Sequence, residues 1–293
     1  MGARLVIGRV VLGLGVIAAT GCAHALSQPM PRLEGKLALK VLNEQPSKWT
    51  EMPLGVHQIP DTSVYVSGHQ GAAGIGVLFG LIGVAAAHAA AQSTGEKKTQ
   101  DAQAQLRLDM RALAERVLTE ELGRRGAANR FAAAGTTGAG SLEIVPYLVV
   151  NFIGDEQVRP WVVLKTMLKD AKGEEQWKTK YVAGVGEARP LGGERGWASE
   201  DGAPLRQHVD RNLRLAMDVL LRDASGTLPR GTGRKVEVKA QWVWVKPFLE
   251  RTAEVLEETE DALVVIPDVA DAFVFAGVNI LDKRAVTVKQ EEK

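Results

Sequence analysis

Histidine and cysteine are the side chains best suited to metal binding and nucleophilic chemistry, and the sequence holds five of the first and one of the second. No two histidines are four residues apart and H-E-x-x-H is absent, so a helical metal site has no visible ligands. A G-x-S-x-G turn, which would seat a hydrolase serine, is also absent. His57 and His69 flank an expected strand and could meet across a turn, while His208 lies on the polar flank of an expected helix. We therefore expect no catalytic residue, no metal and no cofactor.

Charge and composition narrow the class of partners. The 36 Lys and Arg residues nearly balance the 35 Asp and Glu residues, so the net charge is +1 and we expect no nucleic-acid partner. The single cysteine excludes internal disulfide bonds and cysteine-based zinc clusters. The stretch GTLPRGTGRK at 226–235 superficially matches a phosphate loop, but Lys235 is followed by Val236 where Ser or Thr is required. We interpret it as part of a linker.

The first residues have the layout of a secretory signal. Arg4 and Arg9 precede an apolar run that is too short to span a bilayer, and small residues lead up to Cys22. The sequence Ala-Thr-Gly-Cys that ends at Cys22 resembles a bacterial lipobox, in which the cysteine becomes the acylated N-terminus after cleavage. That resemblance implies a signal peptide at 1–21 and a lipidated tether at 22–35. Because Ala rather than Asp follows the cysteine, it also implies the periplasmic face of the outer membrane. A simple secretory signal with an incidental Cys22, or an uncleaved anchor, are the alternatives.

A second apolar segment, at 71–91, is rich in Gly and Ala and carries no Asp, Glu, Lys or Arg. Its small residues recur at four-residue spacing, which lets helix backbones approach closely; they include Gly76, Gly80, Gly83 and Ala87. We expect these residues either to contact a membrane, a partner or a second copy of the chain, or to pack inside the protein. Because glycine weakens a helix in water, the first reading explains the composition more directly.

The chain from 36 to 223 predicts an α+β domain. Strands are expected at 36–42 and 63–67, an amphipathic helix follows at about 106–122, and a second helix closes the domain at 205–221. Between the helices we expect three strands, at 142–152, 161–168 and 176–183. The last two are joined by a tight hairpin turn that contains Asp170 and Gly173. This order predicts an antiparallel or mixed sheet covered by two helices.

Residues 224–234 are interpreted as a linker, and 235–293 as a small all-β unit with period-two apolar positions. The alternative is an extension of the first sheet. Trp242 and Trp244 lie two apart and are expected on one strand face. They form either an exposed interaction surface or the core of this unit.

The lipobox, the helix that ends LTEELGRRG, the hairpin VVLKTMLKDAKGEEQW and the helix DRNLRLAMDVLLRD together resemble bacterial outer-membrane lipoproteins of the curli-secretion and penicillin-binding-protein-activator type. The resemblance covers roughly residues 36 to 223 and implies a non-enzymatic accessory or assembly factor of a cell-envelope machine, with a protein partner in the envelope. The alternatives are an oligomeric outer-membrane pore or export component that inserts 71–91 into the membrane, and a lipid-anchored hydrolase.

Overall fold

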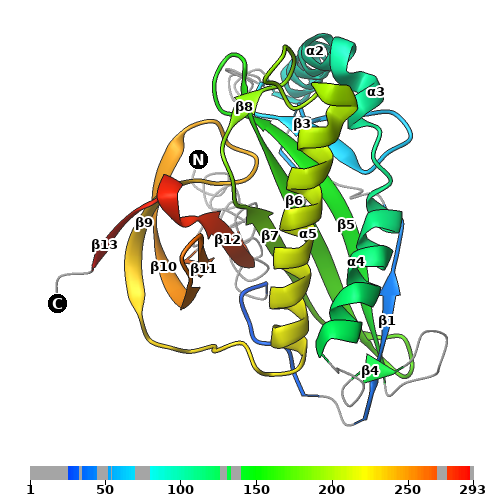
Figure 1. Cartoon of the computed structure of the whole chain (residues 1–293), viewed down its shortest axis with the longest axis vertical. Coiled ribbons are helices and arrows are strands. Elements are labelled where there is room, and N and C mark those ends of the chain that lie inside the picture. The colour runs from blue at the N-terminus through cyan, green and yellow to red at the C-terminus, as the bar shows by residue number, and fades with distance from the viewer. Residues whose placement is uncertain are drawn as a thin grey trace, which may run out of the picture.

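Long apolar strands between residues 140 and 184 form the centre of one mixed sheet. The computed structural model describes residues 26–32, 35–44, 52–53, 55–69, 80–125, 131–132, 140–268 and 276–290. Among these residues thirteen strands join a single sheet, whose main path runs β13-β9-β10-β11-β12-β7-β6-β5-β1-β4 (Figure 1). The strands are β1 (Leu37–Val41), β2 (His57–Gln58), β3 (Val64–Ser67), β4 (Phe131–Ala132), β5 (Gly140–Phe152), β6 (Gln157–Asp170), β7 (Glu175–Gly184), β8 (Arg189–Pro190), β9 (Lys235–Gln241), β10 (Phe248–Glu258), β11 (Ala262–Pro267), β12 (Val278–Asp282) and β13 (Thr287–Gln290). The helices are α2 (Gly80–Thr99), η2 (Gln100–Ala102), α3 (Gln103–Leu106), α4 (Met110–Arg125), η4 (Glu200–Gly202), α5 (Ala203–Ala224) and η6 (Lys283–Ala285).

The hairpin predicted between the second and third central strands is present and joins β6 to β7. Asp170 Oδ1 accepts hydrogen bonds from the backbone N–H groups of Lys172 (2.8 Å) and Glu174 (3.0 Å). Gly173 has φ +86°, a left-handed conformation that suits glycine. Local turn chemistry therefore forms the hairpin that the sequence predicted.

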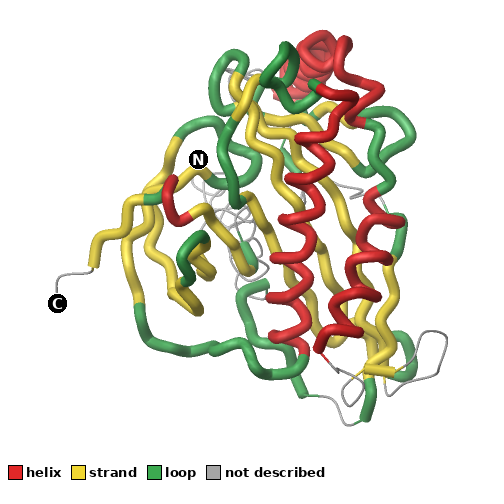
Figure 2. The backbone as a smooth tube through the Cα atoms, in the orientation of Figure 1, coloured by secondary structure: helices red, strands yellow, loops and turns green. Residues whose placement is uncertain are grey.

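Two amphipathic helices, α4 and α5, lie side by side on one face of the sheet (Figure 2). Pro204 stands in the first turn of α5, where its missing N–H costs nothing. The core beneath combines apolar side chains of both helices with those of β5, β6 and β7, including Val117, Leu213 and Leu164. The α+β class is thus confirmed, although the sheet is larger than the sequence predicted.

The C-terminal strands continue the same sheet, because β12 inserts between β11 and β7 and pairs with β7 in parallel. A second core on the opposite face joins β5–β7 to β9–β11, for example Val163 and Val182 with Val238 and Val265. Strands this far apart in the sheet order meet because the sheet curls.

The segment after β9 seals this second core. Asn151 on β5 donates through Nδ2 to the Val245 carbonyl (2.7 Å), and Ser67 on β3 donates through Oγ to the Trp244 carbonyl (3.1 Å). Trp242 and Trp244 are 0% and 3% exposed, so these two indoles form core and no surface patch. They also do not share a strand face, because β9 ends at Gln241 and Trp244 has φ +75°.

Candidate functional site

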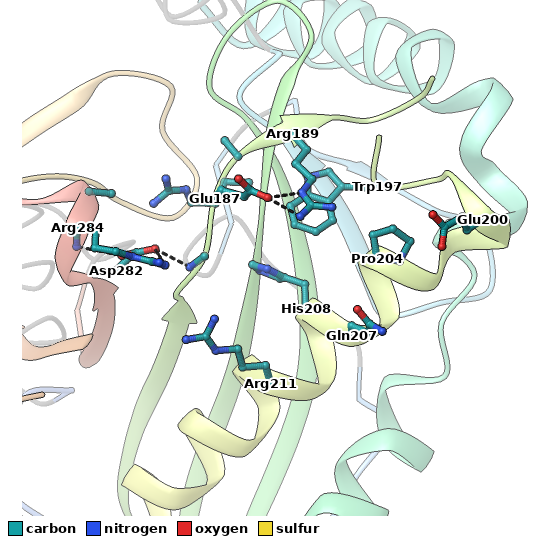
Figure 3. A pocket seen from close by; sticks show the side chains of 14 residues that line it. Glu187, Arg189, Trp197, Glu200, Pro204, Gln207, His208, Arg211, Asp282 and Arg284 are labelled. Carbon is teal, nitrogen blue, oxygen red and sulfur yellow. Dashed lines mark hydrogen bonds and ion pairs between the residues drawn. The ribbon is translucent and has the colours of Figure 1, made fainter. Parts of the chain in front are cut away.

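A cavity of about 860 Å³ opens at the edge of the sheet where β7 and β12 end (Figure 3). The two strands pair in parallel with Leu281 opposite Gly184, so their carboxyl ends reach the same edge. Ligands of sheets with parallel strands commonly bind beyond these ends. One wall of the cavity comes from the first half of α5, and the wall across from it comes from Asp282 and Arg284.

The loop that follows β7 is fixed to both walls. Asn212 of α5 accepts from the Val185 N–H (2.8 Å) and donates to the Val185 carbonyl (3.0 Å). On the other side, Asp282 accepts from the Gly186 N–H (2.9 Å). The cavity therefore has a rigid floor that depends on both the central and the C-terminal strands.

The carboxylate of Asp282 accepts hydrogen bonds from two neighbouring residues, Gly186 and Arg284. Besides the bond from Gly186, it accepts from the backbone N–H (3.0 Å), Nε (3.1 Å) and Nη2 (3.0 Å) of Arg284. Burial disfavours its charge, but these donors prevail and hold the pKa of Asp282 below its ordinary value. Asp282 is therefore ionised at neutral pH and paired with Arg284.

Arg159 is the exceptional group of the cavity. It stands in β6 and is 7% exposed, and its Nε has no hydrogen-bond partner. Within the described part of the chain, its guanidinium makes no hydrogen bond and no ion pair. Burial lowers the pKa of Arg159, while the more distant charge of Asp282 acts in the opposite direction. An arginine still remains protonated, so the floor of the cavity carries a buried positive charge that Asp282 offsets only through space.

His208 of α5 is buried beside it and is neutral. Its Nε2 lies 3.0 Å from the Pro160 carbonyl, which can only accept, so Nε2 carries the proton. Burial lowers its pKa to about 4, and the positive charges of Arg159, Arg211 and Arg189 act in the same direction. The prediction that His208 lies on a polar flank is therefore wrong: it is 8% exposed and packs edge-on against Trp197, with ring centroids 4.8 Å apart.

The other cations of the cavity have protein partners. Arg211 pairs with Asp261 (2.9 Å), and Arg189 pairs with Glu187 and lies over the Trp197 ring, with its guanidinium carbon 5.2 Å from the centroid. These arginine side chains are 38–48% exposed, so each pair is weak and can exchange partners. The mouth of the cavity therefore holds exposed, exchangeable ion pairs above the buried Arg159.

A second histidine site lies beside α2, at the same end of β5 and β6 as Arg159, because the His69 ring contacts Phe152 (centroids 6.5 Å apart), which pairs with Val158. His57 and His69 both approach Gly95 so closely that a Cβ there would lie 2.7 Å from an atom of each. His69 Nε2 lies 2.9 Å from the Ala91 carbonyl, and burial lowers the pKa of both rings. The two histidines therefore come together, as the sequence allowed, and help seat α2 on β2 and β3. In the described ranges no group of three His, Cys, Asp or Glu side chains could hold a metal ion.

The other residues singled out from the sequence are placed as follows. Cys22 and Gly76 lie outside the described residues. Gly80, Gly83 and Ala87 fall in the first half of α2, of which the structure describes the backbone path. Across the described residues, no helix is both long and apolar enough to cross a membrane.

Sequence reasoning missed the cavity. Its only local signal was an arginine placed among apolar residues at the start of a strand, Arg159 before Trp161, and an aspartate at the end of another strand, Asp282. Comparisons with protein-family models, with curated proteins and with solved structures found no match.

Proposed function

We propose that this protein is a lipid-anchored, non-enzymatic accessory or assembly factor on the periplasmic face of the outer membrane, and that its folded domain is a binding module of a cell-envelope machine. The binding role rests on the cavity lined by Arg159, a buried cation whose Nε has no hydrogen-bond partner among the described residues. The sequence around Cys22 carries the anchoring role.

The chemistry of the cavity favours binding over proton transfer. Arginines keep their charge at all physiological pH values and cannot act as bases. A general base works best with a pKa near the operating pH, whereas the pKa of His208 is about 4. The bond from Nε2 to the Pro160 carbonyl also fixes its proton. These groups are suited to holding a ligand.

Part of the segment expected as a tether packs on the sheet, which limits the distance to the membrane. Leu26 is 4% exposed, and its carbonyl accepts from Thr179 of β7. Trp177 of β7 donates through Nε1 to the Gln28 carbonyl (2.9 Å). The chain from Cys22 to Leu26 spans at most about 14 Å, at about 3.5 Å per residue. An acylated Cys22 would therefore hold this part of the domain close to the lipid headgroups.

The cavity lies at the far end of the same strand. From Thr179 to Gly184, β7 covers about 17 Å, at about 3.3 Å per residue. In our proposal the tethered end of β7 faces the membrane and the cavity faces a partner in the periplasm. We further propose that residues 235–290 form a small β unit whose role is to complete the cavity with Asp282 and Arg284.

The anchor is tested with the full chain and its Cys22→Ser variant in a Gram-negative host that is fed labelled palmitate. We expect the wild-type chain to take up label and to sediment with outer membranes, and the variant to be unlabelled and released with the periplasm. Continued labelling of the variant would overturn the anchor.

The binding role is tested by cross-linking in intact cells. We expect a specific envelope partner to be recovered with the wild-type chain and with the control Arg111→Met, whose exposed arginine on α4 pairs with Glu115 (2.8 Å). The same partner should be lost with Arg159→Met. Equal recovery with both variants would count against the cavity as the binding site.

A further inference from the structure

We propose that the cavity binds a small organic anion and that Arg159 pairs with its carboxylate or phosphate group. This inference deepens the proposed binding role by naming the ligand chemistry, and it rests on that role alone, not on the anchor. The site unites a cavity of about 860 Å³ with a charged side chain that is 7% exposed and has no partner among the described residues.

An unpaired buried charge is costly to a folded protein, and it is found where a ligand or counter-ion completes the site. The guanidinium group offers five N–H donors in a planar fork, which matches two oxygens of a carboxylate or a phosphate. At Arg159 the buried Nε donor is used by none of the described residues. A bound oxyanion would satisfy both the charge and the donors.

The carboxylates near Arg159 do not form an ion pair with it, and Asp282 attracts it only through space. Asp282 already accepts four hydrogen bonds, one from Gly186 and three from Arg284. Glu187 is exposed and pairs with Arg189. A counter-ion that is hydrogen-bonded to Arg159 would therefore come from a bound ligand.

The remaining walls define the kind of anion. The volume is in the range of sites for small organic molecules and exceeds the needs of a single inorganic ion. Neutral His208 and the Trp197 indole add no charge beside Arg159, while Arg211 and Arg189 at the mouth can pair with a second negative group. The geometry thus fits a molecule whose oxyanion group reaches the floor and whose remainder fills the mouth.

The test uses the purified full chain in detergent, with succinate as the carboxylate probe and inorganic phosphate as the phosphate probe. Binding is followed by calorimetry and by the melting temperature, and sodium chloride at equal ionic strength corrects for screening. We expect at least one probe to raise the melting temperature beyond chloride, and the probe that does so identifies the oxyanion class. If neither probe exceeds chloride, the proposal is overturned.

Variants of Arg159 test whether its guanidinium group binds the probe. Arg159→Met should weaken probe binding about 10- to 100-fold, since hydrogen bonds to charged groups contribute about 1.5–3 kcal/mol. Arg159→Lys keeps the charge without the planar fork and should retain an intermediate affinity, which also guards against a folding defect of the methionine variant. Arg111→Met is the matched control and should bind as the wild type does. Unchanged affinity in Arg159→Met would refute the assignment, whereas the membrane location in the palmitate experiment would be unaffected.

Discussion

Acidification should destabilise this protein through His208. The pKa of this imidazole is 6.5 in an ordinary environment and about 4 in the folded chain, because burial disfavours the charged ring. The folded state therefore binds the proton more weakly than the unfolded state does. The stabilisation from the neutral ring is fully present above pH 6.5 and is lost as the pH falls from 6.5 to about 4.

The size of this effect follows from the shift. One pKa unit corresponds to about 1.4 kcal/mol, so the shift at His208 corresponds to about 3 kcal/mol, of which about 2–3 kcal/mol is lost between pH 7 and pH 4.5. His57 and His69, whose pKa values burial also lowers, contribute with the same sign. The share of His208 is obtained by comparison with His208→Phe, which keeps a ring against Trp197 but cannot titrate.

The assay is urea unfolding at several pH values between 7 and 4.5, followed by tryptophan fluorescence. We expect the wild type to lose about 2–3 kcal/mol more than His208→Phe over this range. The variant should start from a lower stability at pH 7, since it lacks the bond to the Pro160 carbonyl. Equal losses in the two proteins, or an NMR titration of His208 near pH 6.5, would refute the reasoning.

Three further predictions concern stability at neutral pH and are checked by thermal or urea unfolding. Arg159→Met should raise the free energy of unfolding of the ligand-free protein by about 1–3 kcal/mol, because it removes an unpaired buried charge; a decrease would show that the charge is already compensated. Gly277→Ala should cost about 2–4 kcal/mol, because Gly277 has φ +105° and a Cβ would lie 2.5 Å from the Lys180 carbonyl oxygen. Gly173→Ala, with φ +86° and open space around it, should cost only about 1 kcal/mol, and an equal cost for both would remove the contact argument. Tyr181→Phe should cost about 1.5–3 kcal/mol, since the buried hydroxyl donates to Asp223 Oδ2 (2.6 Å), and a neutral substitution would contradict that bond.

Features set by neighbouring residues were predictable from the sequence. The β6–β7 turn depends on Asp170 and Gly173, and α5 depends on Pro204 and an apolar stripe at three- and four-residue spacing. The start of α4 was less well predicted. The short helix α3 ends at Leu106, and the helical conformation is interrupted until α4 begins at Met110. Periodicity continued across this break and concealed it.

Features set by distant residues were not predictable. The pairing of Val278 with Tyr181 joins segments that no local pattern links, so the C-terminal strands were expected as a separate unit. Trp242 and Trp244 have the spacing of a strand, but tertiary packing ends β9 before them. The cavity was missed for the same reason, because Arg159 is unusual only for the partners that it lacks in three dimensions.

The insertion of β12 has a consequence for the order of folding. Until residues 278–282 dock, β7 is an unprotected edge strand, and apolar side chains such as Val163 and Val182 are not covered by β9–β11. Exposed edges and apolar faces are the features that drive a partly folded chain to pair with other chains. A chain made from its N-terminus reaches residues 278–282 late, so it passes through a stage at which a chaperone would be its best protection from aggregation. Protection of the sheet and completion of the cavity then occur in the same step.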